Sequence, residues 1–137
     1  MQKQVHPQEI EVFYIMPAIR RELTIAMKDL GFTQKKIAKL LGVTEPAVSQ
    51  YVNSKRAVNV DFNEHIKDHI KESAKKISDQ MSLIEEMQFL MRLASNDKLK
   101  CKVCHDITGT DSSCNICYEE KLDEVHEHGK EAKVSKT

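Results

Sequence analysis

Residues 33–56 read TQKKIAKLLGVTEPAVSQYVNSKR, and this stretch decides the fold. Thr33 stands before a run of helix-forming residues, where its hydroxyl can accept a hydrogen bond from a free backbone N–H. The pattern therefore predicts a helix over residues 34–41 with Thr33 as its cap. Gly42 follows after only two turns, and glycine readily adopts the left-handed backbone that ends a helix.

A second short helix is predicted directly after this turn, from Glu45 to Ser54. Thr44 is in the position of its cap, and Pro46 falls in its first turn, where the missing N–H costs nothing. Ala38 is small, so that the second helix can pack closely against the first. The apolar positions that would form a shared core with the preceding helix are Ile37, Leu41, Val43, Val48 and Tyr51. An ordinary helical hairpin needs only these apolar positions, so the whole combination predicts a helix-turn-helix.

Helices are also expected on both sides of this motif. A short one is predicted from Pro7 to about Tyr14, and a longer one from Pro17 to Leu30, ended by Gly31. Downstream, Asp61 and Glu64 are spaced as an N-cap and capping box for a helix that runs to about Lys76. A further helix, ending near Ser95, would begin at Ser78, Asp79 or Ser82, unless residues 62–95 form one long helix.

The segment 62–95 also contains a seven-residue apolar repeat, formed by Ile70, Ile77, Ile84 and Met91. Such a repeat suits helix pairing between two chains. For Ile66 and Ile70 we expect burial in the chain's own core instead. Both roles stay open for Ile84, Phe89, Leu90 and Met91.

The composition describes a helix-rich protein without a membrane span. The chain has 137 residues, of which 40% are hydrophobic, enough for one compact domain and an appendage. No stretch approaches the roughly 20 apolar residues that cross a bilayer, and the N-terminus does not resemble a secretory signal. We expect a cytoplasmic protein. The formal net charge is zero, but residues 17–60 carry eight Lys and Arg against three acidic residues, and residues 118–131 are acidic.

The sequence resembles the phage-repressor-like, or XRE-type, helix-turn-helix regulators over about residues 17–76. The archaeal branch is the most similar, with an opening like FYIMPAIRREL (13–23), a core like LGVTEPAVSQYVNSKR (41–56) and paired cysteines downstream. The resemblance implies that the helix from Glu45 onward lies in the major groove of double-stranded DNA. Gln50 is then the best candidate to read a base, because its amide can pair with both edge atoms of adenine.

Other residues of the motif have more general roles under this resemblance. Ala47 could contact a thymine methyl group, Glu45 could accept from cytosine, and Ser49 could serve a base or a phosphate. The residues expected to hold the phosphate backbone are Thr33, Gln34, Lys35, Thr44, Asn53, Lys55 and Arg56. The basic charge of residues 17–60 supports these contacts.

The four cysteines of the chain form two pairs within 17 residues: Cys101 with Cys104, and Cys114 with Cys117. Each C-x2-C pair can place two thiolates on one metal, and disulfides are disfavoured inside cells. Zinc is slightly favoured as a structural ion, and an iron–sulfur cluster stays open as a sensor. His105 and Tyr118 follow the pairs where a common zinc knuckle has glycine.

The sequence thus predicts an all-α protein of about five helices followed by a small four-cysteine metal module. The expected divisions are a DNA-binding region (1–60), a core-closing and dimerisation segment (61–97), the metal module (98–120) and an acidic helix with a flexible tail (121–137). The predicted function is a transcriptional regulator that binds an operator as a homodimer. The alternative is a metal-stapled protein-interaction adaptor in which DNA binding is secondary. No pattern indicates an enzyme, a small-molecule substrate or a membrane partner.

Overall fold

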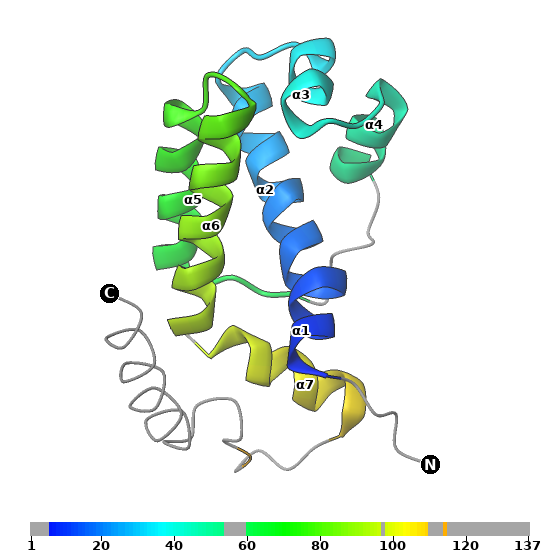
Figure 1. Ribbon diagram of the computed structural model, residues 1–137, viewed down its shortest axis with the longest axis vertical. Helices are drawn as coiled ribbons and strands as arrows, with labels where there is room; N and C mark the ends of the chain where they lie inside the picture. Colours follow the sequence, from blue (N-terminus) through cyan, green and yellow to red (C-terminus); the bar gives the residue numbers. More distant parts are fainter. Residues whose placement is uncertain (1–5, 54–59, 97, 110–113, 115–137) are drawn as a thin grey trace, which may run out of the picture.

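The computed structural model describes residues 6–53, 60–96, 98–109 and 114. These residues form an all-α bundle, as the sequence predicted, and no strand occurs among them. Helix α2 (Met16–Asp29) runs through the middle of the molecule, with α3 (Gln34–Leu41) and α4 (Glu45–Asn53) at one end (Figure 1). Helices α5 (Glu64–Lys76) and α6 (Gln80–Asn96) form an antiparallel pair along one side of α2, and α7 (Leu99–Thr108) closes the opposite end.

The helix predicted from Pro7 to Tyr14 is not separate from the next one. Helix α1 (Pro7–Ile10) continues through a π-helical segment, η1 (Glu11–Ile15), directly into α2. The backbone stays right-handed helical at Ile15, with φ −76° and ψ −49°. Pro17 provides a physical reason, since it lacks an N–H and its ring crowds the preceding turn, and the wider π turn can relieve both effects.

The C-terminal ends of α2 and α3 match the sequence prediction. Gly31 has a φ of +96°, and the N–H of Phe32 donates to the carbonyl of Met27 at 3.0 Å, which closes α2. Gly42 repeats this arrangement at the end of α3, with a φ of +68°. These positive φ values explain the glycines, because an L side chain rarely adopts this conformation.

The start of α5 differs from the prediction. Asn63, not Asp61, is the N-cap, and its side chain accepts from the N–H of Ile66 at 2.9 Å. Asp61 and Glu64 therefore form no capping box. Phe62 is only 5% exposed, so its burial fixes the extended chain before the helix and moves the cap to Asn63.

Residues 62–95 form two helices rather than one. The chain is extended at Ile77 (φ −81°, ψ 118°), and Asp79 then caps α6, its carboxylate accepting from the N–H of Ser82 at 2.8 Å. The seven-residue repeat therefore crosses a turn and cannot be one continuous pairing face. Ile70 and Ile77 are buried in the core, as is Leu90, whereas Ile84 is 53% exposed.

One core joins all the helices around α2. Ile19, Leu23 and Met27 of α2 are fully buried, and Leu99 and Val103 bring α7 into the same cluster. A fully buried leucine or isoleucine contributes roughly 1.5–3 kcal/mol relative to its exposed state, so these positions dominate the stability. No helix in the described part of the chain is long and apolar enough to cross a membrane.

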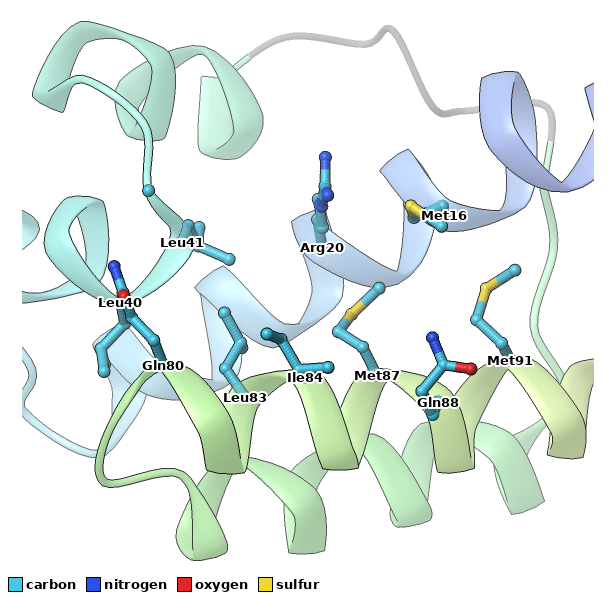
Figure 2. A pocket seen from close by; sticks show the side chains of 11 residues that line it. Met16, Arg20, Leu40, Leu41, Gln80, Leu83, Ile84, Met87, Gln88 and Met91 are labelled. Carbon is cyan, nitrogen blue, oxygen red and sulfur yellow. The ribbon is translucent and has the colours of Figure 1, made fainter.

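A shallow groove opens between α6, α2 and the end of α3 (Figure 2). Its volume is about 260 Å³, and its apolar wall is formed by Met16, Leu40, Leu41, Leu83, Ile84, Met87 and Met91. At its α3 end, the side-chain amide of Gln80 donates to the carbonyl of Lys39 at 3.0 Å and ties the start of α6 to α3.

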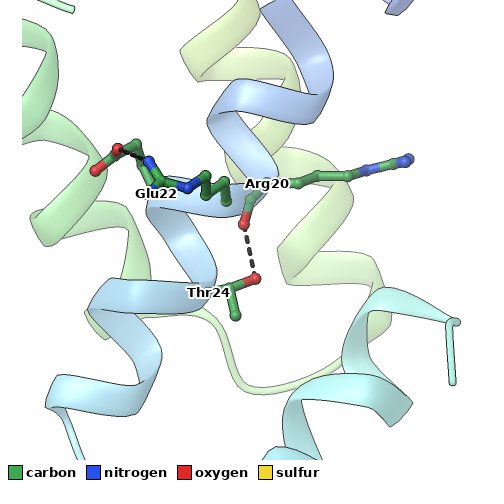
Figure 3. Close-up of polar contacts among 4 residues, drawn as sticks. Arg20, Glu22 and Thr24 are labelled. Carbon is green, nitrogen blue, oxygen red and sulfur yellow. Dashed lines mark hydrogen bonds and ion pairs between the residues drawn. The ribbon is translucent and has the colours of Figure 1, made fainter. Parts of the chain in front are cut away.

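The middle of α2 contains one buried polar side chain, Thr24. Its hydroxyl donates to the carbonyl of Arg20 at 2.7 Å (Figure 3). The buried hydroxyl therefore has a hydrogen-bond partner within its own helix. The side chain of Arg20 points away from the ion pair between Arg21 and Glu22, which is 3.4 Å long. Arg20 instead lines the groove beside α6.

Candidate DNA-binding surface

The surface that the sequence assigned to DNA consists of the N-terminal ends of α3 and α4 and the outer face of α4. Both caps are formed as predicted. The hydroxyl of Thr33 accepts from the N–H of Lys36 at 3.1 Å, and that of Thr44 accepts from the N–H of Ala47 at 3.3 Å. Helix N-termini carry partial positive charge, so two such ends on one surface favour phosphate groups.

The turn between α3 and α4 holds the two helices at a fixed distance. Ala38 is 5% exposed, and its carbonyl accepts from the N–H of Val43 at 3.0 Å. Val48 of α4 is completely buried in the core. One face of α4 is thereby turned inward, and Val48 fixes which residues face solvent.

Most of the predicted recognition residues lie on the side of α4 away from Val48, whereas Glu45 lies one turn before Val48 at the start of the helix. Glu45, Gln50 and Asn53 are exposed, and Ala47 and Ser49 are half-buried. The side-chain amide of Asn53 donates to the hydroxyl of Ser49 at 3.3 Å. Ser49 is thus held in one orientation by its neighbour on the next turn.

The structure adds a contact between the two N-termini that the sequence did not reveal. The side-chain amide of Gln34 donates to the backbone carbonyl of Glu45 at 2.7 Å. Gln34 is half-buried and Lys35 beside it is exposed. No local sequence signal indicates this bond, because the two residues are eleven positions apart and meet only through the fold.

Two further lysines of α3, Lys36 and Lys39, lie on the side of the helix that faces the start of α6, beside Asp79 and Gln80. Lys36 and Lys39 are exposed, as is Lys35. The ammonium group of Lys36 lies 4.3 Å from the centre of the Phe32 ring, so a cation–π contact orients it. Phe32 precedes the N-cap of α3, so helical spacing does not indicate this pair from the sequence. Lys55 and Arg56, the other basic residues assigned to DNA, lie outside the described residues.

Two of the predicted metal ligands, Cys101 and Cys104, lie in α7 at the opposite end of the molecule (Figure 1). Cys101 and Cys104 are both half-buried in α7, three positions apart, which places them on neighbouring turns of one helix face. The thiol of Cys104 is 3.7 Å from the hydroxyl of Thr108. Cys114 is also half-buried, and Cys117 lies outside the described residues. Within the described ranges, no three His, Cys, Asp or Glu side chains are grouped closely enough to hold a metal.

The helix-turn-helix region is the part of the chain that comparison with known proteins identifies. Residues 23–75, which include α3 and α4 entirely, match the family model described as Cro. No curated protein and no solved structure matches the chain. Together with the capped α3–turn–α4 geometry, the match shows that residues 23–75 carry a Cro-like helix-turn-helix domain, the domain of phage-repressor-like regulators.

Proposed function

We propose that this chain is a transcriptional regulator that binds a specific operator in double-stranded DNA as a homodimer. The observation that carries the proposal is the outer face of α4, where Gln50 and Asn53 are exposed on a helix whose N-terminus is capped by Thr44. A helix presented in this way fits the major groove, which admits one α-helix. The sequence features FYIMPAIRREL and the downstream cysteine pairs support a place in the archaeal branch of the XRE-type regulators.

The residues divide into two classes by their chemistry. Gln50 is exposed, so its amide can turn toward a base edge. Ala47 lies one turn before Gln50 on α4, and Ser49 directly precedes it. Thr33, Thr44 and Lys35 lie around the helix N-termini, where contacts to phosphate are expected. Glu45 begins α4, and its carboxylate would repel phosphate unless it meets a cytosine amino group.

The decisive experiment is selection of binding sites from random double-stranded DNA, followed by affinity measurements with variants. Replacing Gln50 with alanine should lower the preference for the selected site over scrambled DNA by about tenfold, since a bidentate contact gives roughly 1–3 kcal/mol of discrimination. Ser49→Ala should have a smaller effect of the same kind. Gln8→Ala, at an exposed position on α1, is the matched control and should change nothing.

Each result bears on the proposal. Loss of discrimination with an unchanged melting temperature supports base reading by α4. If no sequence is enriched, or if Gln50→Ala discriminates as well as the parent chain, the proposed regulator function is wrong. The adaptor alternative would then be the better interpretation.

We further propose that Cys101, Cys104, Cys114 and Cys117 hold one metal centre. The two half-buried thiols of Cys101 and Cys104, on neighbouring turns of α7, suit two of the four ligands of such a site. Bound there, zinc would supply a structural cross-link, and an iron–sulfur cluster would supply redox sensitivity. Metal and sulfide analysis with a visible spectrum, on protein purified without oxygen, distinguishes the two. Protein that contains neither, and whose thiols react at the same rate with and without a chelator, would contradict the proposal.

A further inference from the structure

Helix α6 has one side in the core and one side that nothing in the described part of the chain covers. Leu83, Met87, Leu90 and Ala94 point inward and are at most 8% exposed. The outer strip consists of the exposed residues Met81, Ile84, Glu85, Gln88 and Arg92, and the half-buried Met91 lies at its inner edge, where it packs against the core. Ile84 is 53% exposed and Met81 is 65% exposed, although both are large apolar side chains.

The outer strip borders the groove between α6 and α2. Ile84 projects at the edge of this groove, and Met16, Met87 and Met91 form the wall further along α6 (Figure 2). When two identical surfaces meet, the exposed isoleucine of each copy can lie against the apolar hollow of the other. Methionine side chains adapt easily to a side chain inserted between them.

The charged residues of the strip also suit a contact between two identical surfaces. An apolar residue followed by an acid, Ile84 and Glu85, is repeated seven positions later as an apolar residue followed by a base, Met91 and Arg92. Seven residues span about 10.5 Å along a helix, so Glu85 and Arg92 of one chain are too far apart to pair with each other. Neither has an ion pair among the described residues.

We propose that a second copy of the chain covers this strip, with the two α6 helices antiparallel and a two-fold axis passing near Gln88. This register places Ile84 of each copy beside Met91 of the other, at the mouth of the groove. It also places Glu85 of each copy beside Arg92 of the other, so the same ion pair forms twice, as an isologous interface requires. The other side of α6 is already occupied, because Phe89 packs on His69 of α5 with ring centres 5.5 Å apart.

The proposal deepens the homodimer of the proposed function by assigning its surface, and its test requires no DNA. Failure here would therefore leave the DNA-binding proposal untouched, and failure of DNA binding would leave this interface untouched. The dimer dissociation constant is measured by sedimentation equilibrium over a range of concentrations, at low and high salt.

Ile84→Asp should raise the dimer dissociation constant at least about tenfold, because the interface loses two buried isoleucines, one from each chain, and gains two carboxylates. Leu30→Asp is the matched control: Leu30 is 46% exposed at the end of α2, where it lines a hollow against α5 and not the groove beside α6, and its replacement should leave the dimer intact. Circular dichroism melts of both variants show whether the bundle remains folded.

The charge pairs provide a test that does not depend on removing apolar surface. Glu85→Arg alone and Arg92→Glu alone should each weaken the dimer, because each places like charges across the axis. The double variant E85R/R92E should restore it, because both pairs are then re-formed in reverse. Gln88→Cys, placed at the axis, should give under mild oxidation a disulfide that joins position 88 of the two chains, identified by peptide mass spectrometry.

Rescue by the double variant together with the link at position 88 would establish the interface. A monomeric parent chain at all concentrations would overturn the proposal. It would also be overturned by a dimer that is unaffected by both Ile84→Asp and Glu85→Arg, which would place the dimer contact on another surface.

Discussion

The side-chain amide of Gln34, the first residue of α3, donates to the backbone carbonyl of Glu45, the first residue of α4, at 2.7 Å. The bond ties together the two helix N-termini that face the predicted DNA surface. It crosses the turn at Gly42 and fixes the direction in which α4 leaves that turn. Gln34 therefore positions the start of α4, the helix that we propose reads the operator.

Replacing Gln34 with alanine should weaken DNA binding about threefold to tenfold, because loss of a hydrogen bond of roughly 1 kcal/mol frees the start of α4. The reduction should be larger for the specific site than for scrambled DNA, because base reading depends on the direction of α4, whereas loss of a phosphate contact would weaken both alike. Gln80→Ala is the control, since that residue makes the same kind of bond, amide to the carbonyl of Lys39 at 3.0 Å, away from the DNA surface. Fluorescence anisotropy at fixed salt measures both, and equal effects of the two substitutions would contradict the positioning role.

Gly42 gives a second prediction, because replacing it should destabilise the protein only through the strain of a left-handed backbone at a residue with a side chain. Its φ is +68°, and a Cβ added there would meet no atom within 4 Å. Gly42→Ala should therefore lower the free energy of unfolding by about 1 kcal/mol. Gly109, at the end of α7, has a φ of +70° and the same open space, so Gly109→Ala should cost a similar amount.

DNA binding separates these two glycines. Gly42 lies between α3 and α4, so Gly42→Ala should also reduce DNA affinity, whereas Gly109→Ala should not. Chemical denaturation gives the stabilities and anisotropy gives the affinities. A loss of affinity in both variants would mean that general destabilisation, not the turn, controls binding.

The features that the sequence predicted correctly are those determined within a few residues. Thr33 caps α3 and Gly42 ends it through contacts that span at most five positions, so the local pattern contains all the information. The inward side of α4 was also predictable, since Val48 is the apolar residue that the turn places toward α2. Caps, turn glycine and apolar spacing are therefore sufficient to identify the helix-turn-helix from the sequence.

The features that the sequence predicted wrongly depend on tertiary contacts. Asp61 and Asn63 are both good capping residues, and the burial of Phe62 between them decides in favour of Asn63. The seven-residue repeat looked continuous because Ile77 fits its period, but Ile77 is buried in the turn between α5 and α6. Which half of the repeat remained at the surface could not be known until that turn was placed.

The contribution of α7 to the fold gives a third prediction. Val103 is 2% exposed and packs in the core shared by all the helices, and Lys100 pairs with Glu11 of η1 at 2.7 Å. Val103→Ala should lower the free energy of unfolding by about 2 kcal/mol, since it removes two buried methyl groups and leaves a cavity. The unfolding should stay a single transition when followed by circular dichroism and by thiol reactivity.

Val12→Ala is the matched control for this change, because Val12 is 52% exposed and should alter stability by no more than about 0.5 kcal/mol. Two separate transitions, or equal effects of the two substitutions, would show that α7 is not part of the cooperative core.

The cap of α6 gives a prediction about acid stability. The N–H of Ser82 donates to the carboxylate of Asp79, and this hydrogen bond lowers the pKa of Asp79 below its ordinary value. A carboxylate with a depressed pKa in the folded state stabilises the protein above its unfolded pKa of about 3.9, and this contribution is lost as the pH falls through the folded value. Asp79→Ala should therefore lower the melting temperature at pH 7, and its difference from the parent chain should shrink as the pH is taken from about 5 to about 3.

Asp79→Asn separates capping from ionisation. Asparagine caps helices about as well as aspartate but does not titrate, so the variant should keep most of the melting temperature at pH 7. Its stability should respond less steeply to acid than that of the parent chain, because the carboxylate that becomes protonated is gone. Melting curves of the three proteins at half-unit pH steps measure this, and a difference between Asp79→Ala and the parent chain that stays constant down to pH 3 would show that the charge of Asp79 contributes nothing to the cap.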